Sequence, residues 1–296
     1  MKFEGIIVKR YSGFYYILSD DKNIWECSLR GRFRLKKQTF FPGDNVVCTK
    51  IDEDNKKAVI EEVLPRFSEL ERPLIANVDQ VVIVLALSNI LTDLQLLDRI
   101  MIMAQYNKVK PIICFNKVDI IDYDTALSFE KVYKKTNFPV FLTSALKDWG
   151  IEDLKQIMKD KISVFAGPSG VGKSSLFNAL EKGLSLETGE VSKKLNRGKH
   201  TTRHTELLPL SEGGLLADTP GFSKLDLPQE LKKERLIDYY PDFWEHGKSC
   251  SFCTCLHRNE LECGVRKAAE SGILDEGRYN RYLHFLEEVI TNERRY

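Results

Sequence analysis

The chain has 296 residues and a formal net charge of +1, a length that suits two or three domains with substantial cores. The near-zero charge excludes a bulk electrostatic attraction to nucleic acid, so any such binding must come from local patches. The longest purely apolar run, Val81 to Leu87, is too short to span a bilayer, and the first residues lack the apolar stretch of a signal peptide. We expect a cytoplasmic protein without membrane association, and a monomer by default.

Residues 1–67 have the pattern of a small β domain. Short runs of β-branched and aromatic residues are separated by glycine and proline turn signals, and these runs are Ile6–Val8, Phe14–Leu18, Val46–Cys48 and Ala58–Ile60. Roughly five strands in this length predict a small barrel. Between them, Arg30–Lys37 alternates cations with apolar residues and one aromatic, Phe33. This composition suits phosphate contact and base stacking on RNA, and a solvated charged loop is the alternative.

Residues 68–226 change to apolar, strand-like runs that alternate with helical stretches. This pattern predicts an α/β domain, with a parallel sheet covered by helices. The expected strands are Val81–Leu87, Pro111–Phe115, Pro139–Leu142 and Ile162–Ala166, and the expected helices are Asp93–Tyr106, Thr125–Thr136 and Ile151–Met158. Sequence motifs follow the carboxyl ends of these strands, where open α/β sheets bind their ligands.

The Asn-Lys-Val-Asp motif at 116–119 directly follows the second expected strand. The Asp119 carboxylate can accept hydrogen bonds from two adjacent N–H groups of guanine, a donor pair that adenine lacks. Asn116 would fasten neighbouring loops and the base edge, and the stem of Lys117 would lie over the base. In the Ser144-Ala145 segment, the backbone amide of Ala145 would meet the guanine oxygen. The motif therefore favours a guanine nucleotide over ATP.

A Gly-x4-Gly-Lys-Ser phosphate loop follows the strand Ile162–Ala166 and leads into helical spacing. Its backbone amides can surround the phosphates, Lys173 can reach the β- and γ-phosphates and assist catalysis, and Ser174 can ligate Mg²⁺. Ser175 can add a hydrogen bond to the α-phosphate. The expected nucleotide contacts of this loop are Gly167, Pro168, Ser169, Gly170, Val171, Gly172, Lys173, Ser174 and Ser175.

A switch motif, Asp-Thr-Pro-Gly at 218–221, follows an apolar run. Asp218 can hold Mg²⁺ through water, and the amide of Gly221 can sense the γ-phosphate. The next residue is Phe222, where many GTPases carry the glutamine that positions the attacking water. A phenyl ring cannot form those hydrogen bonds, so another group must orient the water.

The loop Gly198-Lys199-His200-Thr201-Thr202 supplies candidates for the missing roles. The near-neutral imidazole of His200 can hold or deprotonate a water, and we treat it as the candidate catalytic residue, with an uninvolved loop histidine as the alternative. Thr202, with Thr201 as the alternative, is the candidate to ligate Mg²⁺ and contact the γ-phosphate during catalysis.

The order of these motifs is permuted. In ordinary GTPases the phosphate loop precedes the switch, and the guanine motif comes last, whereas here 116–119 comes first and 218–221 last. The sequence therefore indicates a circularly permuted GTPase. The switch then runs directly into the carboxyl-terminal residues, so we expect the nucleotide state to move that module.

Four of the seven cysteines crowd between Cys250 and Cys263, with His257 among them. In a cytosolic chain this crowding indicates a metal rather than disulfides. Zinc needs four ligands, and the sequence leaves two choices open: a set that includes the Cys250-x2-Cys253 knuckle, or the set Cys250, Cys255, His257 and Cys263. Four protein ligands leave no open position, which predicts structural zinc; free thiols are the alternative.

Beyond the cysteines, an apolar stripe recurs at helical spacing, comprising Tyr279, Tyr282, Leu283, Leu286, Val289 and Ile290. The stripe predicts a packing face. Four arginines lie among these residues, at 278, 281, 294 and 295. They are interpreted as solvated charges, with RNA contact as the alternative.

Together these motifs resemble those of the RsgA (YjeQ) family of circularly permuted ribosome-assembly GTPases, over nearly the whole chain. The resemblance implies an N-terminal OB-fold barrel at 1–67, a circularly permuted P-loop GTPase domain at 68–226, and a mostly helical zinc-binding domain at 227–296. It implies one structural Zn²⁺ on Cys250, Cys255, His257 and Cys263, leaves Cys253 spare, and supports the catalytic role of His200. One departure is Arg203, where a third threonine is expected.

The resemblance implies hydrolysis of Mg²⁺-bound GTP to GDP and phosphate, stimulated by the small ribosomal subunit and its rRNA during late maturation, with nucleotide-dependent release. Two other classes stand beside it. A P-loop kinase or ATPase is disfavoured by Asn116 and Asp119. A non-hydrolysing guanine-nucleotide scaffold, in which Phe222 marks lost catalysis, is separated only by assay with the partner.

Overall fold

The structure is a computed structural model that describes residues 1–31, 33, 39–71, 74–87, 90–181, 205–218 and 226–294. The predicted site residues His200, Thr201, Thr202 and Gly221 lie outside these ranges. The chain divides into two compact units. Unit 1 comprises Met1–Val82, Ile151–Ala166 and Lys173–Ser223, and unit 2 comprises Ile83–Gly150, Gly167–Gly172 and Lys224–Tyr296.

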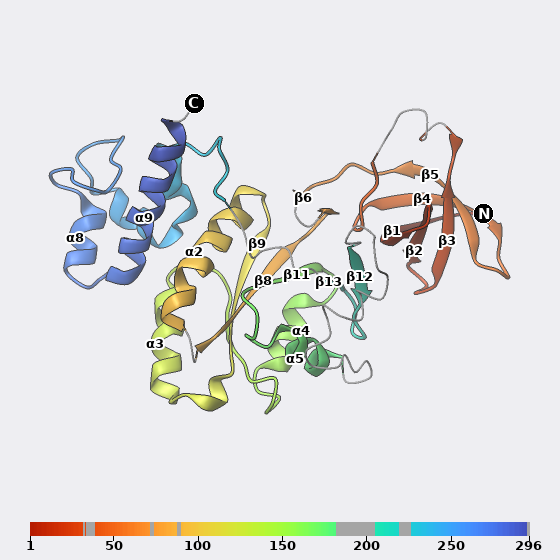
Figure 1. Cartoon of the computed structure of the whole chain (residues 1–296), viewed down its shortest axis with the longest axis horizontal. Coiled ribbons are helices and arrows are strands. Elements are labelled where there is room, and N and C mark those ends of the chain that lie inside the picture. Colours follow the sequence, from red (N-terminus) through yellow and green to blue (C-terminus); the bar gives the residue numbers. More distant parts are fainter. Residues whose placement is uncertain are drawn as a thin grey trace. The chain divides into compact units, whose positions relative to one another are not determined.

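Unit 1 begins with a closed five-stranded barrel (Figure 1), formed by β1 (Lys2–Tyr11), β2 (Phe14–Ser19), β3 (Ile24–Leu29), β4 (Asn45–Asp52) and β5 (Lys57–Val63). The strand order is β1-β2-β3-β5-β4, and β4 pairs back onto β1 to close the barrel. Along β2 and β3, alternate residues point inward and are buried. The predicted barrel is confirmed, although its third strand was not among the expected runs.

Phe33 corrects the prediction of a base-stacking segment. Its ring is buried in the barrel core and packs edge-on against Phe40 with ring centroids 5.3 Å apart. Arg30, at the start of the same segment, forms an ion pair with Glu61 at 2.5 Å. The aromatic residue therefore stabilises the barrel and is not available to stack on RNA. The remaining cations of this segment, at 32 and 34–37, lie outside the described residues.

The rest of unit 1 contains strands that carry the phosphate loop and the switch. A two-stranded sheet of β6 (Glu69–Glu71) and β7 (Leu74–Ala76) leads to β8 (Gln80–Ala86), whose first residues belong to this unit. Beside the start of β8 lie β11, β13 and β12 in that order. These elements, with their helices, are α4 (Ile151–Met158), β11 (Ile162–Ala166), α5 (Lys173–Leu180), β12 (Glu206–Pro209) and β13 (Leu215–Asp218).

The strands of this part of unit 1 pair in a defined register, and the strand that leads to the phosphate loop is buried. β11 and β13 run parallel, with Ile162 opposite Leu215, and β12 returns antiparallel to β13. All residues of β11 are buried, as expected for a parallel strand covered on both faces. The predicted strand Ile162–Ala166 and helix Ile151–Met158 match β11 and α4.

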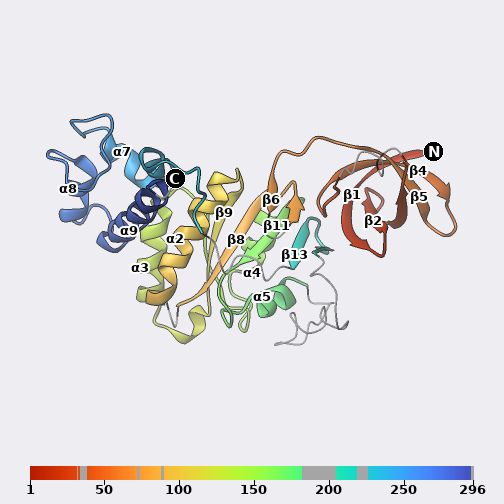
Figure 2. The same ribbon diagram turned by 45° about the horizontal axis from the view of Figure 1, so that its top comes forward.

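Unit 2 contains the end of β8 together with β9 (Lys110–Asn116) and β10 (Val140–Leu142), and β9 and β10 are parallel. Figure 2 shows α2 (Ile90–Tyr106) and α3 (Tyr123–Lys134) alongside this part of the sheet. The short helix η2 (Val118–Ile120) separates β9 from α3, whose first turn is capped by Asp122. The predicted strands and helices of this region are thus present, with ends shifted by a few residues.

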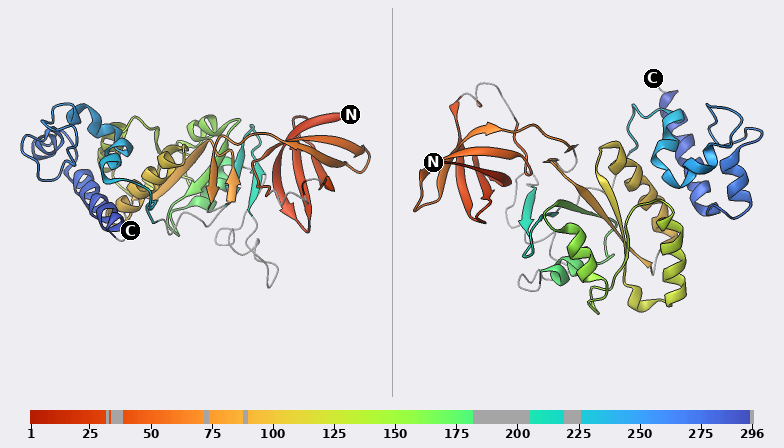
Figure 3. Two further views of the ribbon diagram at one scale, coloured as in Figure 1. Left: turned by 90° about the horizontal axis from the view of Figure 1, so that it is seen from above. Right: turned by 180° about the vertical axis from the view of Figure 1, so that it is seen from behind.

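The carboxyl-terminal part of unit 2 is helical, with η4 (Lys233–Tyr239), η5 (Pro241–Phe243), α7 (Trp244–Gly247), α8 (Gly264–Glu270) and α9 (Glu276–Glu293). The two views of Figure 3 show α9 beside α2. The predicted packing stripe is confirmed, because Tyr279, Tyr282, Leu286 and Val289 are buried on α9. Among the described helices, none is long and apolar enough to cross a membrane.

Two arginines of α9 correct the sequence interpretation of solvated or RNA-binding charges. Arg278 is 2% exposed and donates to Asp98 and Asp242, and Arg281 donates to the second oxygen of Asp98. Both guanidinium groups face carboxylates inside unit 2, so they hold α9 to its neighbours. Asp98 lies on α2 and Asp242 on η5.

Candidate nucleotide site and metal centre

Asn116 joins the guanine motif to the phosphate loop within unit 2. Its side chain lies at the end of β9 and is 1% exposed. The Nδ2 atom donates to the carbonyl of Val171 at 2.9 Å. The Oδ1 atom accepts from Thr143 Oγ1 at 3.1 Å and from the amide of Ala145 at 3.3 Å. One amide group therefore fastens three segments, as the sequence predicted for a loop-fastening asparagine.

Thr143 is a supporting residue that sequence reasoning did not single out. Its hydroxyl is buried and lies between Asn116 Oδ1 and the sulfur of Cys114, 3.3 Å from the latter. The amide of Val118 donates to the carbonyl of Thr143 at 3.1 Å. The signal was present in the sequence, because Thr143 directly follows β10, the strand that runs parallel to β9, and directly precedes Ser144-Ala145.

Lys117 turns toward the phosphate loop. Its backbone adopts a left-handed conformation, with φ of 61°, and its Nζ donates to the carbonyl of Gly170 at 2.7 Å. Asp119 follows in η2 and is partly exposed. A carboxylate placed there is open to a ligand, and the stem of Lys117 lies between the two motifs. This arrangement brings together the two parts that the sequence assigned to base and phosphate.

The two outer glycines of the phosphate loop leave no room for side chains. Gly172 has φ of +99°, and a Cβ placed on it would lie 2.4 Å from Nδ2 of Asn116. Gly167 has φ of +135°, and its Cβ would lie 2.1 Å from the carbonyl oxygen of Val84. Both the left-handed conformation and the close approach require glycine. The conformation of the loop thus depends on the same asparagine that holds the guanine motif.

Residues 173–175 form the first turn of α5 in unit 1, directly after this loop, and all three are partly buried. The first turn of a helix presents unpaired amides and the positive end of its dipole, which favours anions. Lys173 and the hydroxyls of Ser174 and Ser175 are therefore placed on a turn suited to phosphate oxygens.

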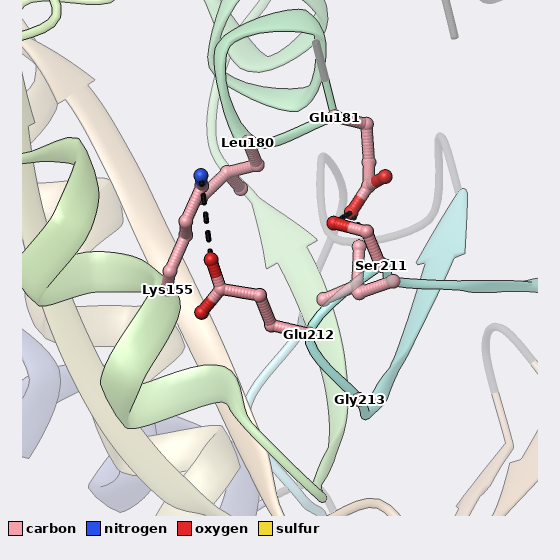
Figure 4. A pocket seen from close by; sticks show the side chains of 7 residues that line it. Lys155, Leu180, Glu181, Ser211, Glu212 and Gly213 are labelled. Carbon is pink, nitrogen blue, oxygen red and sulfur yellow. Dashed lines mark hydrogen bonds and ion pairs between the residues drawn. The ribbon is translucent and has the colours of Figure 1, made fainter. Parts of the chain in front are cut away.

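Glu181 ties the end of α5 to the turn between β12 and β13 (Figure 4). Its carboxylate accepts from the amide of Ser211 at 2.8 Å and from the Ser211 hydroxyl at 3.2 Å. In the same turn Glu212 lies 3.7 Å from Lys155 of α4. Strand β13 ends at Asp218, so these contacts fix the strand that leads to the switch aspartate. Sequence reasoning did not find this anchor, because its partners are 30 residues apart.

Unit 2 also holds a compact cluster of metal-ligand side chains, Cys250, Cys255, His257 and Cys263. Their ligand atoms all lie within 4.8 Å of one another. Cys253 is exposed and does not belong to this group. Of the two sets that the sequence left open, the structure therefore assembles the one with Cys255 and His257.

The spacing of these atoms fits a tetrahedral zinc site. Bond lengths of about 2.3 Å to sulfur and 2.0–2.1 Å to nitrogen require ligand separations of about 3.8 Å between thiolates and 3.5 Å between thiolate and imidazole. Sγ of Cys250 lies 3.9 Å from Sγ of Cys263 and 3.5 Å from Nδ1 of His257. Sγ of Cys263 lies 3.4 Å from the same nitrogen. The Cys₃His cluster is therefore compatible with zinc.

The protonation states of two of these side chains bear on metal binding. Burial raises the pKa of the Cys255 thiol to about 12, so a positive charge is needed to hold it as a thiolate at neutral pH. Burial also lowers the pKa of His257, which keeps the imidazole neutral and able to ligate a metal.

Tyrosines of α9 hold the loop that carries the ligands. Tyr279 donates to the carbonyl of His257 at 2.7 Å, and Tyr282 donates to that of Leu256 at 3.0 Å. Glu260 accepts from the amides of Leu256 and Arg258 at 2.7 and 2.8 Å. The packing stripe of α9 thus has a second role, since it orients the backbone around the metal ligands.

Comparison with known proteins defines the family. The family model described as "RsgA GTPase" matches residues 61–228, and the model described as "RsgA N-terminal domain" matches residues 4–60. This chain belongs to the RsgA GTPase family. The resemblance found in the sequence motifs is therefore confirmed.

Relatives named "Small ribosomal subunit biogenesis GTPase RsgA" match at nearly full length. The RsgA protein of Alkaliphilus metalliredigens is 44% identical over 291 residues, which cover 98% of this chain and 99% of its own. The RsgA protein of Bacillus subtilis is 42% identical, with 99% of each chain covered.

Two crystal structures share the fold. YjeQ from Thermotoga maritima superposes with a TM-score of 0.81 at 35% identity, and the match covers 98% of this chain and 99% of YjeQ. YloQ, described as a circularly permuted GTPase, gives 0.82 at 36% identity, with 100% of this chain and 98% of YloQ covered. The predicted fold class is confirmed, with an N-terminal barrel, a circularly permuted GTPase and a helical C-terminal region with a Cys₃His cluster.

Proposed function

We propose that this chain hydrolyses GTP to GDP and phosphate and, by doing so, assists the late maturation of the small ribosomal subunit. The observation that carries the proposal is the bridge that Asn116 builds from the guanine motif to the phosphate loop. This bridge joins the two motifs by hydrogen bonds, which supports one site that binds both the base and the phosphates of a guanine nucleotide. The names of the RsgA relatives supply the ribosomal partner.

Base recognition follows from the residues around Asn116. The Asp119 carboxylate accepts from the ring N–H and the amine of guanine, and the amide of Ala145 donates to the guanine oxygen. Lys117, held by Gly170, lies along the base. Ser144 supports this loop, because its hydroxyl accepts from the amide of Lys147 at 3.2 Å. ATP offers no donor pair to Asp119 and is rejected.

The phosphates are bound by the loop amides of 167–172 and by the first turn of α5. Lys173 would neutralise charge on the β- and γ-phosphates, Ser174 and Thr202 would hold Mg²⁺, and Asp218 would support the ion through water. When bound, the ion withdraws charge from the β- and γ-oxygens. The amide of Gly221 senses the γ-phosphate.

Hydrolysis requires an oriented water, and His200 is the group that we assign to it. The water oxygen attacks the γ-phosphorus, the bond to the β–γ bridging oxygen breaks, and that electron pair leaves with GDP. The imidazole holds the water and accepts its proton, which ends on the released phosphate or solvent. The His200→Ala variant should hydrolyse GTP at least about 100-fold more slowly but bind it unchanged; unchanged turnover would remove this role.

We expect the three domains to have separate roles. We propose an OB-fold barrel at 1–67 that contacts rRNA, a GTPase domain at 68–226, and a zinc-binding domain at 227–296 with one structural Zn²⁺ on Cys250, Cys255, His257 and Cys263. The GTP state favours the subunit-bound form and the GDP state the released form, which requires different affinities in the two states. The protein acts as a monomer in the cytoplasm, where subunits mature.

The decisive experiment measures GTP hydrolysis by the purified protein alone, with small ribosomal subunits, and with large subunits as the control. The expected result is weak turnover alone and strong stimulation by small subunits only. No response to either subunit would contradict the proposal and favour a non-hydrolysing scaffold. Co-sedimentation with a non-hydrolysable GTP analogue and with GDP tests the release step.

A further inference from the structure

Two neighbouring loops of unit 2 expose large apolar side chains beside the base site. In the segment that runs from β9 through η2 to the first turn of α3, Ile120 is 58% and Tyr123 70% exposed, and in the loop after β10 Leu146 is 81% and Trp149 54% exposed. Because β9 and β10 are parallel neighbours, the two loops leave the sheet at the same edge. Single exposed apolar residues are ordinary, but four on adjacent loops are typical of a recognition surface.

The backbone beneath these side chains is fixed. Ser144 and Trp149 exchange two backbone hydrogen bonds, of 3.0 and 3.1 Å, and close the second loop. The amide of Val118 donates to the carbonyl of Thr143 at 3.1 Å and ties the first loop to the second. Asp122 caps α3 by accepting from the amide of Thr125 at 2.9 Å. Apolar side chains on a preorganised backbone lose little entropy when a partner binds.

The charge of the loops indicates the chemistry of that partner. They carry four carboxylates, at Asp119, Asp122, Asp124 and Asp148, against the two cations of Lys117 and Lys147. Lys117 is directed to the carbonyl of Gly170, so the outward-facing field is acidic. Such a field repels the phosphates of RNA and attracts lysine and arginine side chains.

We propose that the loop surface formed by Ile120, Tyr123, Leu146 and Trp149 is a docking site for a basic protein segment. Leu146 and Trp149 enter apolar contacts at its centre, and Asp122 and Asp124 pair with cationic side chains at its rim. The inference rests on the proposed function, because it takes the segment to belong to a protein of the small ribosomal subunit.

A photo-cross-linking experiment tests the identity of the partner. Trp149 is replaced by p-benzoylphenylalanine, and the full chain is irradiated with purified small subunits and a non-hydrolysable GTP analogue. The expected adduct contains a ribosomal protein and survives ribonuclease. An adduct to rRNA alone, or no adduct while the protein still co-sediments with the subunit, would overturn the docking site. Failure of the unsubstituted protein to co-sediment would instead overturn the proposed function, and this inference with it.

A charge reversal distinguishes a protein partner from an RNA partner, because the two cases predict opposite changes in affinity for the subunit. In the Asp124→Lys variant, association with the subunit should weaken about tenfold if the partner is basic. It should become tighter if the loops face RNA, and that result, or no change, would overturn the proposal.

An apolar substitution tests the centre of the surface. The Leu146→Ser/Trp149→Ser variant should bind the subunit at least about tenfold more weakly. The matched control is Ile273→Ser, which removes an aliphatic residue 56% exposed elsewhere in the same unit. GTP hydrolysis without subunits should be unchanged in the double variant, in the Ile273→Ser control and in the Asp124→Lys variant. Unchanged hydrolysis verifies that these variants fold. Equal subunit binding by the double variant and the control would contradict the proposal.

Discussion

Arg278 of α9 and Asp98 of α2 form an ion pair of 2.7 Å with side-chain exposures of only 2% and 0%. Arg278 also donates to both oxygens of Asp242, at 2.5 and 3.0 Å. Asp98 also accepts from Arg281 at 2.6 Å and from the hydroxyl of Tyr133 at 2.9 Å. Two carboxylates thus balance two guanidinium groups inside unit 2, which is the condition for burying such charges.

The buried ion-pair cluster is connected to the guanine motif through aromatic packing. The ring of Tyr133 lies edge-on to Phe115, with centroids 5.8 Å apart, and Phe115 directly precedes Asn116 on β9. The helical carboxyl-terminal module is therefore bound to the elements that hold the base. Separating the module from α2 would break this cluster, which costs several kcal/mol.

The Asp98→Asn substitution is expected to lower the free energy of unfolding by about 3–5 kcal/mol, because it leaves buried Arg278 with reduced charge compensation. Urea unfolding measured by far-UV circular dichroism checks the value. The control is Asp238→Asn, which removes the ion pair between Asp238 and Arg235. The side chains of these two residues are 40% and 73% exposed, respectively. The Asp238→Asn substitution should change the free energy of unfolding by no more than about 0.5 kcal/mol. Similar costs for both variants would contradict a stabilising role of the buried cluster.

Stability should depend on pH through Glu288. Burial raises the pKa of Glu288, but the hydrogen bond and charge of Arg99 on α2 together outweigh it, so the pKa lies below its ordinary value. A carboxyl group with a depressed folded pKa stabilises the fold above its unfolded pKa of about 4.3 and loses this contribution as pH falls through the folded pKa. Glu288→Gln should therefore be less stable than the unsubstituted protein at pH 7.

The pH profile of the difference is the test. Thermal unfolding of both proteins between pH 7 and pH 3 should show a stability gap that narrows as pH falls below about 4.3. A gap that is constant over this range would show that the substitution acts through packing and not through the charge of Glu288.

The sequence predicted the features that are local and missed those that join distant segments. The strand before each motif, the loop-fastening role of Asn116 and the apolar face of α9 follow from periodicity and motif context within a few residues. The choice between Cys253 and Cys255 as a zinc ligand required the three-dimensional structure, because the spacing of either cysteine from Cys250 is compatible with a zinc site. In the sequence it came only from the family resemblance.

Burial of polar and aromatic residues was the main error. Arg278 has the pattern of an exposed helix cation, because its partner Asp98 lies 180 residues away and nothing local announces it. Phe33 stands among cations and still enters the barrel core. Thr143 and Glu181 support the site through contacts across 27 and 30 residues. Such pairings are set by topology, which a one-dimensional pattern does not contain.

The metal cluster predicts opposite outcomes for two neighbouring cysteines. The Cys255→Ser variant removes a ligand and should lose the zinc that we expect at one ion per chain, whereas Cys253→Ser should retain it. Because metal binding is coupled to folding, Cys255→Ser should also unfold at a temperature lower by at least about 5 °C. Metal analysis and calorimetry on the full chain check both values. Equal zinc loss in the two variants would contradict the ligand set.

The phosphate loop offers a comparison that separates backbone strain from steric contact. Gly170 and Gly172 have φ of +82° and +99°, so an alanine at either position is strained by a similar amount. At Gly170 a Cβ meets no atom within 4 Å, but at Gly172 it meets Nδ2 of Asn116 at 2.4 Å. Only the second substitution displaces the side chain that holds Val171 and Ala145.

We therefore expect Gly172→Ala to weaken GDP binding at least about 100-fold and Gly170→Ala by no more than about tenfold, since one lost buried hydrogen bond network adds about 1–3 kcal/mol to the strain. Titration with a fluorescent GDP analogue measures both affinities. Because the clash acts through Asn116, Asn116→Ala should remove most of the difference between the two alanine variants. A difference that persists in the Asn116→Ala background would mean that Gly172 is needed for its own contacts with phosphate and not for its fit against the guanine motif.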